Sequence, residues 1–443
     1  MTRETFATRF GILMTMIGVA VGLGNVWRFP YLVGRYGGAA FVLAYLLIVF
    51  LVGVPGLMAE WSLGRHARRG TVGAFAAAGF PAGKPLGWFL FAVVIAATAY
   101  YTNVVGWVMY FAVGELATAV GLSWQSVSVL PPDAGFRTGS LARQAACSAL
   151  VVASCALVLQ LGLRNGIERA SRIIMPGLFA ILLLLLLRSL TLDGAGAGVR
   201  WYIGHVAWSD LSPTVLVAAM GHAIFSLSLG GTFMVTYGSY LADREDLGRN
   251  AVLTATGDTL AGLLAGLVIF PAVFALGLEP ASGPGLLFET IPGLFDRIPA
   301  GWIFAFLFFA GLFGAAYLSD VAAFEVLIAG LTDNTRLPRT RAVWLMAGVV
   351  FLVALVPMIN MRIFLRWDLT FGSGMQTFGA LCAALAAGWS MQRGALLAQV
   401  GGDATHGWRG WIPVWLRFVV PGAILAVGLW WLATDVLRII GTV

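Results

Sequence analysis

Two glycine-rich segments place polar side chains inside apolar runs of the sequence. Residues 18–25 read GVAVGLGN, and residues 226–232 read SLSLGGT. Glycine lowers helix propensity, and Asn or Ser brings polar atoms to a depth where a membrane-spanning helix is apolar. An unwound helix exposes carbonyl oxygens that bind a cation and N–H groups that bind a carboxylate. The chemistry that these segments suggest is the binding of a cation and a carboxylate.

Other interpretations of these segments remain open. Glycines in mid-helix also serve as small-residue contacts between tightly packed helices, although such packing does not require Asn25 or Ser226 beside them. An enzyme needs acid, base and nucleophilic groups that converge, whereas His66, His205, His222 and His406 are scattered along the chain. A passive channel predicts a ring of like polar residues, which the sequence does not suggest.

The elements that must position these segments are membrane helices. Apolar residues form 60% of the chain and charged residues 11%, a composition that a water-exposed surface of this size does not tolerate. Apolar stretches of roughly 20 residues recur, each long enough to cross the hydrocarbon core. They predict about eleven spans, at residues 10–34, 39–64, 87–118, 142–161, 167–190, 214–241, 250–276, 298–332, 340–359, 367–391 and 413–437.

The two interruptions open two halves of about five spans each. Corresponding breaks in two halves indicate an inverted-repeat transporter. We therefore expect one integral domain over residues 1–443, with a first repeat at about 10–190, a second at about 214–391 and an additional helix at about 413–437.

The basic residues are biased to one side of this topology. The bias predicts a cytoplasmic N-terminus in a bacterial-type inner membrane, and it explains the net charge of +7 without nucleic acid. Lipid and a small molecule are the expected partners, and the protein is expected to be a monomer or weak dimer. Cys147, Cys155 and Cys382 lie within predicted spans, without metal-ligand spacing.

Several motifs resemble the neurotransmitter:sodium symporter family, whose bacterial members have the LeuT-type fold. The motifs are GVAVGLGNVWRFP at 18–30, the pair Tyr100 and Tyr101, GIER at 166–169, FSLSLGG at 225–231, TYGSY at 236–240 and AGLVIFP at 265–271. The resemblance implies an all-α polytopic membrane protein with a 5+5 inverted repeat, in which helices 1 and 6 are unwound at mid-membrane. It also implies sodium-coupled import of an amino acid by alternating access, without enzymatic activity.

The resemblance implies a substrate site between the two breaks. The substrate carboxylate would lie against Leu23, Gly24 and Tyr101, and the ammonium against Ala20 and Ser228. Gly22 occupies the position of the Asp that binds the amine in amine-transporting relatives, which favours an α-amino acid. The remaining implied contacts are Val19, Ala97, Phe225, Ser226, Gly231, Ser319 and Ala323. Because most of these are small, we expect a bulky hydrophobic or aromatic substrate. Read alone, Tyr101 is also compatible with an interior tyrosine that bonds to a carbonyl.

A first sodium site is implied at Ala20, Asn25, Ser226 and Asp258, all of them sources of hard oxygen ligands. Asp258 replaces the neutral Asn of several relatives. Gly262 lacks the hydroxyl that chloride-dependent relatives have, so we expect transport without chloride. The alternative for Asp258 is a charge paired to a nearby Arg.

A second sodium site is implied at Gly18, Val21, Ala315 and Ser319, but Leu318 stands where a second hydroxyl is expected. Three alternatives remain open: the site is weakened, the adjacent Asp320 rearranges to serve it, or a proton replaces part of the coupling. The alternative function is thus a family member with altered coupling, by one sodium or a proton, and an unusual amino-acid-like substrate.

The resemblance also implies two gates. Arg28 and Asp368 match the outer ion pair, and Arg3 and Asp333 match the inner pair, with Phe6 as the aromatic residue that packs nearby. Read alone, Arg3 is also compatible with an ordinary positive-inside residue.

Overall fold

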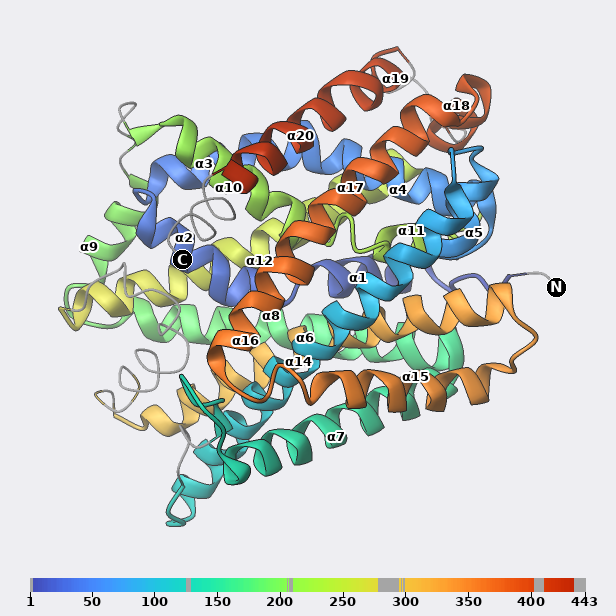
Figure 1. Ribbon diagram of the computed structural model, residues 1–443. Coiled ribbons are helices and arrows are strands. Elements are labelled where there is room, and N and C mark those ends of the chain that lie inside the picture. The colour runs from blue at the N-terminus through green and yellow to red at the C-terminus, as the bar shows by residue number, and fades with distance from the viewer. Residues whose placement is uncertain are drawn as a thin grey trace.

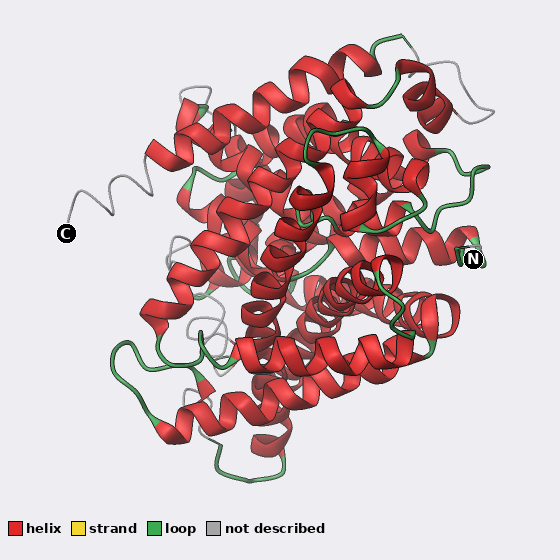
Figure 2. Cartoon of the chain, turned by 45° about the vertical axis from the view of Figure 1, so that its right-hand side comes forward, coloured by secondary structure: helices red, strands yellow, loops and turns green. Residues whose placement is uncertain are grey.

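The computed structural model describes residues 3–124, 129–204, 206, 210–277, 295, 297, 299–401 and 410–433. His205, His406 and residues 434–437 of the last predicted span lie outside the described residues. The regular secondary structure of the described part is helical (Figures 1 and 2). In Figure 1 the N-terminus lies at the same end of the helix bundle as α5, α18 and α19.

The first half of the chain contains α-helices with short π-helical segments, here labelled η, between some of them. Its elements are α1 Arg9–Ala20, η1 Gly24–Arg28, α2 Phe29–Arg35, α3 Ala39–Ile48, η2 Val49–Gly53, α4 Val54–Ala67, α5 Thr71–Ala77, α6 Gly83–Ala119, α7 Thr138–Gln160, η4 Leu163–Glu168, α8 Arg169–Leu190, α9 Ala195–Val199 and η5 Arg200–Gly204.

The second half continues in the same way. Its elements are α10 Pro213–Ser226, α11 Phe233–Gly238, α12 Leu247–Ala275, α14 Gly301–Asn334, α15 Arg339–Ala354, α16 Met361–Trp367, η8 Asp368–Gly374, α17 Met375–Leu385, η9 Ala386–Ser390, α18 Arg393–Gly401, α19 Ile412–Val414, η10 Trp415–Val419 and α20 Val420–Trp431.

Eight helices in the described part are long and apolar enough to cross a membrane, and the bent pair Arg9–Ala20 with Gly24–Arg35 adds a ninth. The predicted spans at 214–241 and 340–359 correspond to shorter helices, α10 with α11 and α15 respectively. Each predicted span therefore overlaps a helix or a broken helix, and the count of eleven crossings stays a prediction.

The first break follows α1, which ends at Ala20. Val21 has extended backbone torsions (φ −70°, ψ 121°), and the helix axis turns by 56° before it continues at Gly24. The side-chain oxygen of Asn25 accepts a hydrogen bond of 3.0 Å from the backbone N–H of Gly22. Asn25 therefore satisfies one of the backbone groups that the break leaves without a helical partner.

The second break separates α10, which ends at Ser226, from α11, which begins at Phe233. Gly230 has φ +84°, and a Cβ atom there would lie 1.7 Å from the carbonyl oxygen of Gln376. Glycine is thus required both by the torsion angle and by the close approach of α17. The buried Glu60 accepts a 2.7 Å hydrogen bond from the Gly230 N–H, so α4 stabilises this break through a single side chain.

Candidate substrate and sodium site

A cavity of about 550 Å³ lies between the two breaks. Its lining residues come from α1 and η1, α6, the α10–α11 region, α14 and α17. They are Ala20, Gly22, Leu23, Gly24, Ala97, Thr98, Tyr100, Tyr101, Phe225, Ser226, Ser228, Phe233, Ser319, Ala323 and Gln376. Of the residues predicted to contact substrate, Val19 and Gly231 are absent from this lining.

Val19 takes part in the site through its backbone. The Ser228 hydroxyl donates a 2.8 Å hydrogen bond to the Val19 carbonyl and so joins the two breaks directly. The Val19 side chain is buried with 2% exposure. A contact of Val19 with the substrate stays a prediction, and in this structure its carbonyl connects the two unwound segments.

Gly231 does not enlarge the cavity, because the Phe233 ring fills the adjacent space. A Cβ atom built on Gly231 would lie 2.1 Å from the Phe233 ring. Phe233 itself lines the cavity. The glycine makes room for an aromatic side chain of the protein, and a contact of Gly231 with the substrate stays a prediction.

The end of the cavity nearest the first break is polar. The Leu23 N–H donates a 3.5 Å hydrogen bond to the Tyr101 hydroxyl. A Cβ atom on Gly22 would lie 2.8 Å from both that hydroxyl and the Ser319 hydroxyl. A backbone N–H and a hydroxyl thus converge at this end, donors of the kind that suit a carboxylate, and a side chain on Gly22 has no room there.

Asn25, Ser226 and Asp258 form a buried cluster beside the cavity. The amide nitrogen of Asn25 donates to the Ser226 hydroxyl, the Asp258 carbonyl and the Asp258 carboxylate at 3.0, 2.9 and 2.7 Å. Three oxygen acceptors that converge on one point are also an arrangement that suits an alkali cation. Ala20, the fourth predicted ligand residue, ends α1 at the edge of the adjoining cavity.

The hydrogen-bond partners of Asp258 are polar side chains. Its carboxylate also accepts hydrogen bonds from Ser226 at 2.7 Å and from Tyr45 at 3.3 Å. Within the described residues Asp258 forms no ion pair. The interpretation of Asp258 as the partner of a nearby Arg is therefore not the one that the geometry favours.

The predicted second sodium site is only partly assembled. Ser319 donates to the Val21 carbonyl at 3.1 Å and to the Ala315 carbonyl at 3.4 Å. On the neighbouring side, a Cβ atom built on Gly18 would lie 3.0 Å from the Leu318 side chain. An apolar side chain thus packs where an oxygen ligand was expected.

Asp320 does not face this position. Its carboxylate accepts hydrogen bonds from Thr102 at 3.0 and 3.1 Å and lies 3.9 Å from the Cys155 sulfur. Successive residues of a helix point about 100° apart, so Asp320 faces α6 and α7 while Ser319 faces the break. In this conformation Asp320 is not placed to serve the second sodium site, and the alternative in which it rearranges to do so stays a prediction.

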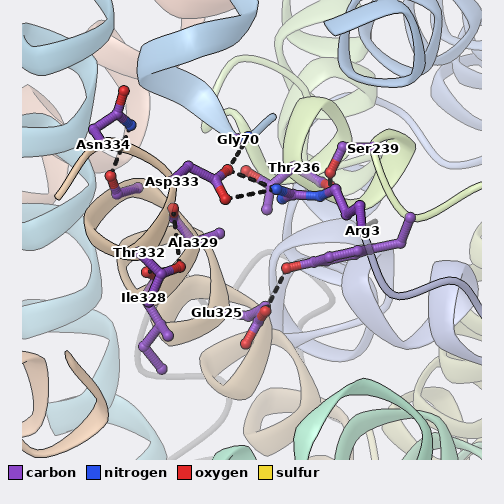
Figure 3. A network of polar contacts seen from close by, with 12 residues as sticks. Arg3, Gly70, Thr236, Ser239, Glu325, Ile328, Ala329, Thr332, Asp333 and Asn334 are labelled. Carbon is purple, nitrogen blue, oxygen red and sulfur yellow. Dashed lines mark hydrogen bonds and ion pairs between the residues drawn. The ribbon is translucent and has the colours of Figure 1, made fainter. Parts of the chain in front are cut away.

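The two residues predicted to form the inner gate make an ion pair (Figure 3). Arg3 contacts the Asp333 carboxylate at 2.6 and 2.8 Å, and Asp333 also accepts a 2.7 Å hydrogen bond from the Gly70 N–H. The guanidinium lies 4.6 Å from the centre of the Tyr240 ring, which Phe6 meets edge-on. Burial lowers the pKa of Arg3, but Tyr240 and Asp333 raise it above the ordinary value overall, so the group stays charged.

The outer pair is apart. Arg28 and Asp368 both line a vestibule of about 840 Å³ that shares Tyr101 and Phe225 with the central cavity. Among the described side chains, neither forms an ion pair within 4.0 Å, and the Arg28 guanidinium lies 4.7 Å from the centre of the Phe225 ring. With the inner pair closed and the outer pair open, the cavity faces the side opposite the N-terminus.

The sequence analysis missed four lining residues: Thr98, Tyr100, Phe233 and Gln376. Thr98 and Tyr100 flank predicted residues on α6, so helical spacing from Ala97 and Tyr101 was a usable signal. Phe233 and Gln376 had no comparable signal, because their position depends on how the second break and α17 pack.

Comparisons with known proteins agree with this arrangement. The signature of the Sodium:neurotransmitter symporter family matches residues 3–130 and 128–430. The chain is 33% identical over 440 residues to the uncharacterized sodium-dependent transporter YhdH of Bacillus subtilis, covering 95% of this chain and 96% of YhdH. It is 27% identical over 440 residues to the sodium- and chloride-dependent creatine transporter 1 of Oryctolagus cuniculus, covering 84% and 68% respectively.

A solved structure is similar over nearly the whole chain. The crystal structure of MhsT in complex with L-phenylalanine superposes with a TM-score of 0.84 at 33% identity, covering 97% of this chain and 99% of MhsT. The described helices therefore adopt the LeuT-type arrangement.

Proposed function

Because this chain belongs to the Sodium:neurotransmitter symporter family, and is thus a sodium-dependent membrane transporter and not an enzyme, we propose that it imports a bulky hydrophobic or aromatic α-amino acid by alternating access. The observation that carries this proposal is the meeting of the two helix breaks at one cavity, with the cluster of Asn25, Ser226 and Asp258 beside it. A carboxylate bound at Leu23 and Gly24 would lie next to a sodium ion in that cluster, so each would strengthen the binding of the other.

An α-amino acid fits the first break better than a decarboxylated amine. The cavity lining contains no acidic residue, and the space beside Gly22 is taken by the Tyr101 and Ser319 hydroxyls. An amine without a carboxylate would bring no acceptor to the Leu23 N–H, whose contact with the Tyr101 hydroxyl is long at 3.5 Å. MhsT, whose structure contains L-phenylalanine, supports an amino acid with an aromatic side chain.

We expect transport to be independent of chloride. The Asp258 carboxylate supplies a fixed negative charge beside the proposed sodium ion. Gly262 offers no hydroxyl, and the Phe29 ring lies 3.4 Å from where its Cβ atom would be. An apolar ring next to Gly262 disfavours an anion there, because a buried charge needs compensating donors.

A second candidate concerns the coupling. Leu318 packs beside Gly18 where a hydroxyl ligand was expected, which favours a transporter that carries one sodium ion, or one sodium ion and a proton, with an unusual amino-acid-like substrate. The two candidates share the first sodium site and differ in the number and kind of coupled ions.

For the cycle, we propose that the Arg3–Asp333 pair and the Arg28–Asp368 pair close in alternation. Ion pairs at water-filled vestibules form and break at a cost of about 1 kcal/mol or less, which suits reversible gates. The clustering of Arg residues at the end where the N-terminus lies supports a cytoplasmic N-terminus in a bacterial-type inner membrane.

The test is uptake of radiolabelled amino acids into proteoliposomes, with sodium, lithium, chloride and pH varied independently. We expect concentrative uptake of a large apolar amino acid under a sodium gradient, at equal rates in chloride and gluconate. The absence of sodium-driven uptake of any amino acid would overturn the proposal. A sodium Hill coefficient near one, with or without a pH gradient effect, would favour the second candidate.

A further inference from the structure

The Gln376 side chain in the cavity wall has an unused hydrogen-bonding group. The hydroxyls of Ser319, Ser228 and Thr98 donate to the backbone carbonyls of Val21, Val19 and Val94 respectively. The Ser226 hydroxyl belongs to the proposed sodium cluster. The Gln376 amide, by contrast, forms no side-chain hydrogen bond with any described residue, although it faces the cavity.

Gln376 is held in a fixed position by the backbone of α17. Its carbonyl oxygen lies 1.7 Å from where a Gly230 Cβ atom would be, and a Cβ atom on Gly379 would lie 2.0 Å from the Gly230 oxygen. Such interlocked backbones leave little freedom for α17 to shift relative to the second break. The amide is therefore presented to the cavity by a rigid element, as a specificity-determining group must be.

The same part of the cavity has aromatic walls. Phe225 is the penultimate residue of α10 and Phe233 begins α11, and both line the cavity together with Gln376. Aromatic rings pack well against a further ring in offset or edge-to-face geometry. Since no lining side chain carries a charge, the complementary ligand group is a ring with a neutral donor or acceptor.

Resting on the proposed function, we propose that Gln376 selects for an amino acid whose aromatic side chain carries a hydrogen-bonding group, an indole N–H or a phenol O–H. The amide has both an acceptor and donors, so it serves either group. A site with an unpaired polar group discriminates against a ligand that leaves the group unpaired, more strongly than an apolar site discriminates by size.

The experiment measures displacement of radiolabelled phenylalanine from purified protein in sodium, with tryptophan, tyrosine, phenylalanine and 4-methylphenylalanine as competitors. We expect tryptophan or tyrosine to bind about three- to tenfold more tightly than phenylalanine, the range of one neutral hydrogen bond. 4-Methylphenylalanine has nearly the shape of tyrosine without its hydroxyl, so it should behave like phenylalanine.

Gln376→Met keeps the length of the side chain and removes the amide. It should abolish the preference, so that tryptophan and tyrosine bind no more tightly than phenylalanine to the same variant. The matched control is Thr377→Val, because the Thr377 hydroxyl donates to the Ser373 carbonyl one turn away and Thr377 does not line the central cavity. It should retain the preference.

The proposal is overturned if the wild-type protein binds all four competitors equally, or if the preference survives in Gln376→Met. A loss of phenylalanine binding in Gln376→Met would equally overturn it, since Gln376 would then support the site as a whole. Failure of the wild-type protein to bind any amino acid is a different result, and it would count against the proposed function.

Discussion

The Ser226 hydroxyl donates a 2.7 Å hydrogen bond to the Asp258 carboxylate, so the last residue of α10 is tied to the middle of α12. The carboxylate is fully buried, and its described partners are neutral donors. A buried anion of this kind is stabilised by any cation that reaches it. Sodium binding at the proposed site would therefore be coupled to the position of the second helix break through this contact.

Asp258→Asn should weaken sodium binding. The substitution keeps the shape and removes the charge, and a charge-assisted contact contributes about 1.5–3 kcal/mol. We expect the half-saturating sodium concentration for uptake to rise about tenfold or more. The control is Thr259→Val, which removes a buried hydroxyl that has no hydrogen-bond partner among the described residues. An unchanged sodium requirement in Asp258→Asn would exclude Asp258 as a ligand.

Gly22→Ala should damage the carboxylate end of the cavity. The new methyl group would lie 2.8 Å from the Tyr101 and Ser319 hydroxyls, too close without displacement of one of them. We expect amino-acid affinity to fall about tenfold or more, as measured by equilibrium binding in sodium. Gly348→Ala in α15, where a Cβ atom meets nothing within 4 Å, should leave affinity unchanged. Equal affinities in the two variants would contradict this account.

Leu318→Ser should restore an oxygen ligand to the partly assembled second sodium site. We expect the Hill coefficient for sodium to increase, although removal of the buried leucine costs about 2–5 kcal/mol of stability. Leu318→Ala creates nearly the same cavity without the hydroxyl and is the matched control. If both variants show the same sodium dependence, the hydroxyl adds no ion.

Arg3→Gln should open the inner gate. It removes the ion pair with Asp333 and the cation–π contact with Tyr240, which together are worth about 1–2 kcal/mol at partly exposed sites. We expect faster hydrogen–deuterium exchange in α1 and less concentrative uptake. Arg341→Gln, which changes an exposed side chain near the same end, should have neither effect. Unchanged exchange in Arg3→Gln would argue against a gating role.

Gly230→Ala should destabilise the fold and abolish uptake. It combines a positive φ, which costs about 1–2 kcal/mol for a residue with a side chain, with a clash against the Gln376 carbonyl. Gly277→Ala has a similar φ of +66° and nothing within 4 Å of its Cβ atom, so it isolates the torsional cost. The difference in thermal midpoint between the two variants measures the contact with α17.

Much of the fold was predictable because it depends on local composition. Apolar length determines the helices, and clusters of glycine with Asn25 or Ser226 mark where they break. The side chains that meet at the breaks were less predictable. Asn25 and Asp258 occupy positions whose role the family resemblance implied. Phe233, by contrast, reaches the cavity because Thr232 adopts φ 58° and Gly231 leaves space for the ring. The spacing of residues along the sequence does not predict such a backbone conformation.

The positions of Leu318 and Asp320 at the predicted second sodium site have a similar origin. Leu318, Ser319 and Asp320 are consecutive, and their roles depend on the rotation of α14 about its axis. Only the structure shows that Leu318 packs beside Gly18 while Asp320 accepts hydrogen bonds from Thr102 on α6. Helical periodicity indicated that the three side chains diverge, but not which neighbour each one meets.

The contact between Arg28 and the Phe225 ring has a consequence for turnover. To pair with Asp368, Arg28 must leave the ring, so each closure exchanges one weak attraction for another. A cation–π contact and an exposed ion pair are each worth about 1 kcal/mol or less, so their difference is close to thermal energy. On the proposed gating role, the Arg28–Asp368 pair would then have no strongly preferred position of its own, and occupancy of the cavity beneath it would determine how long the gate stays shut.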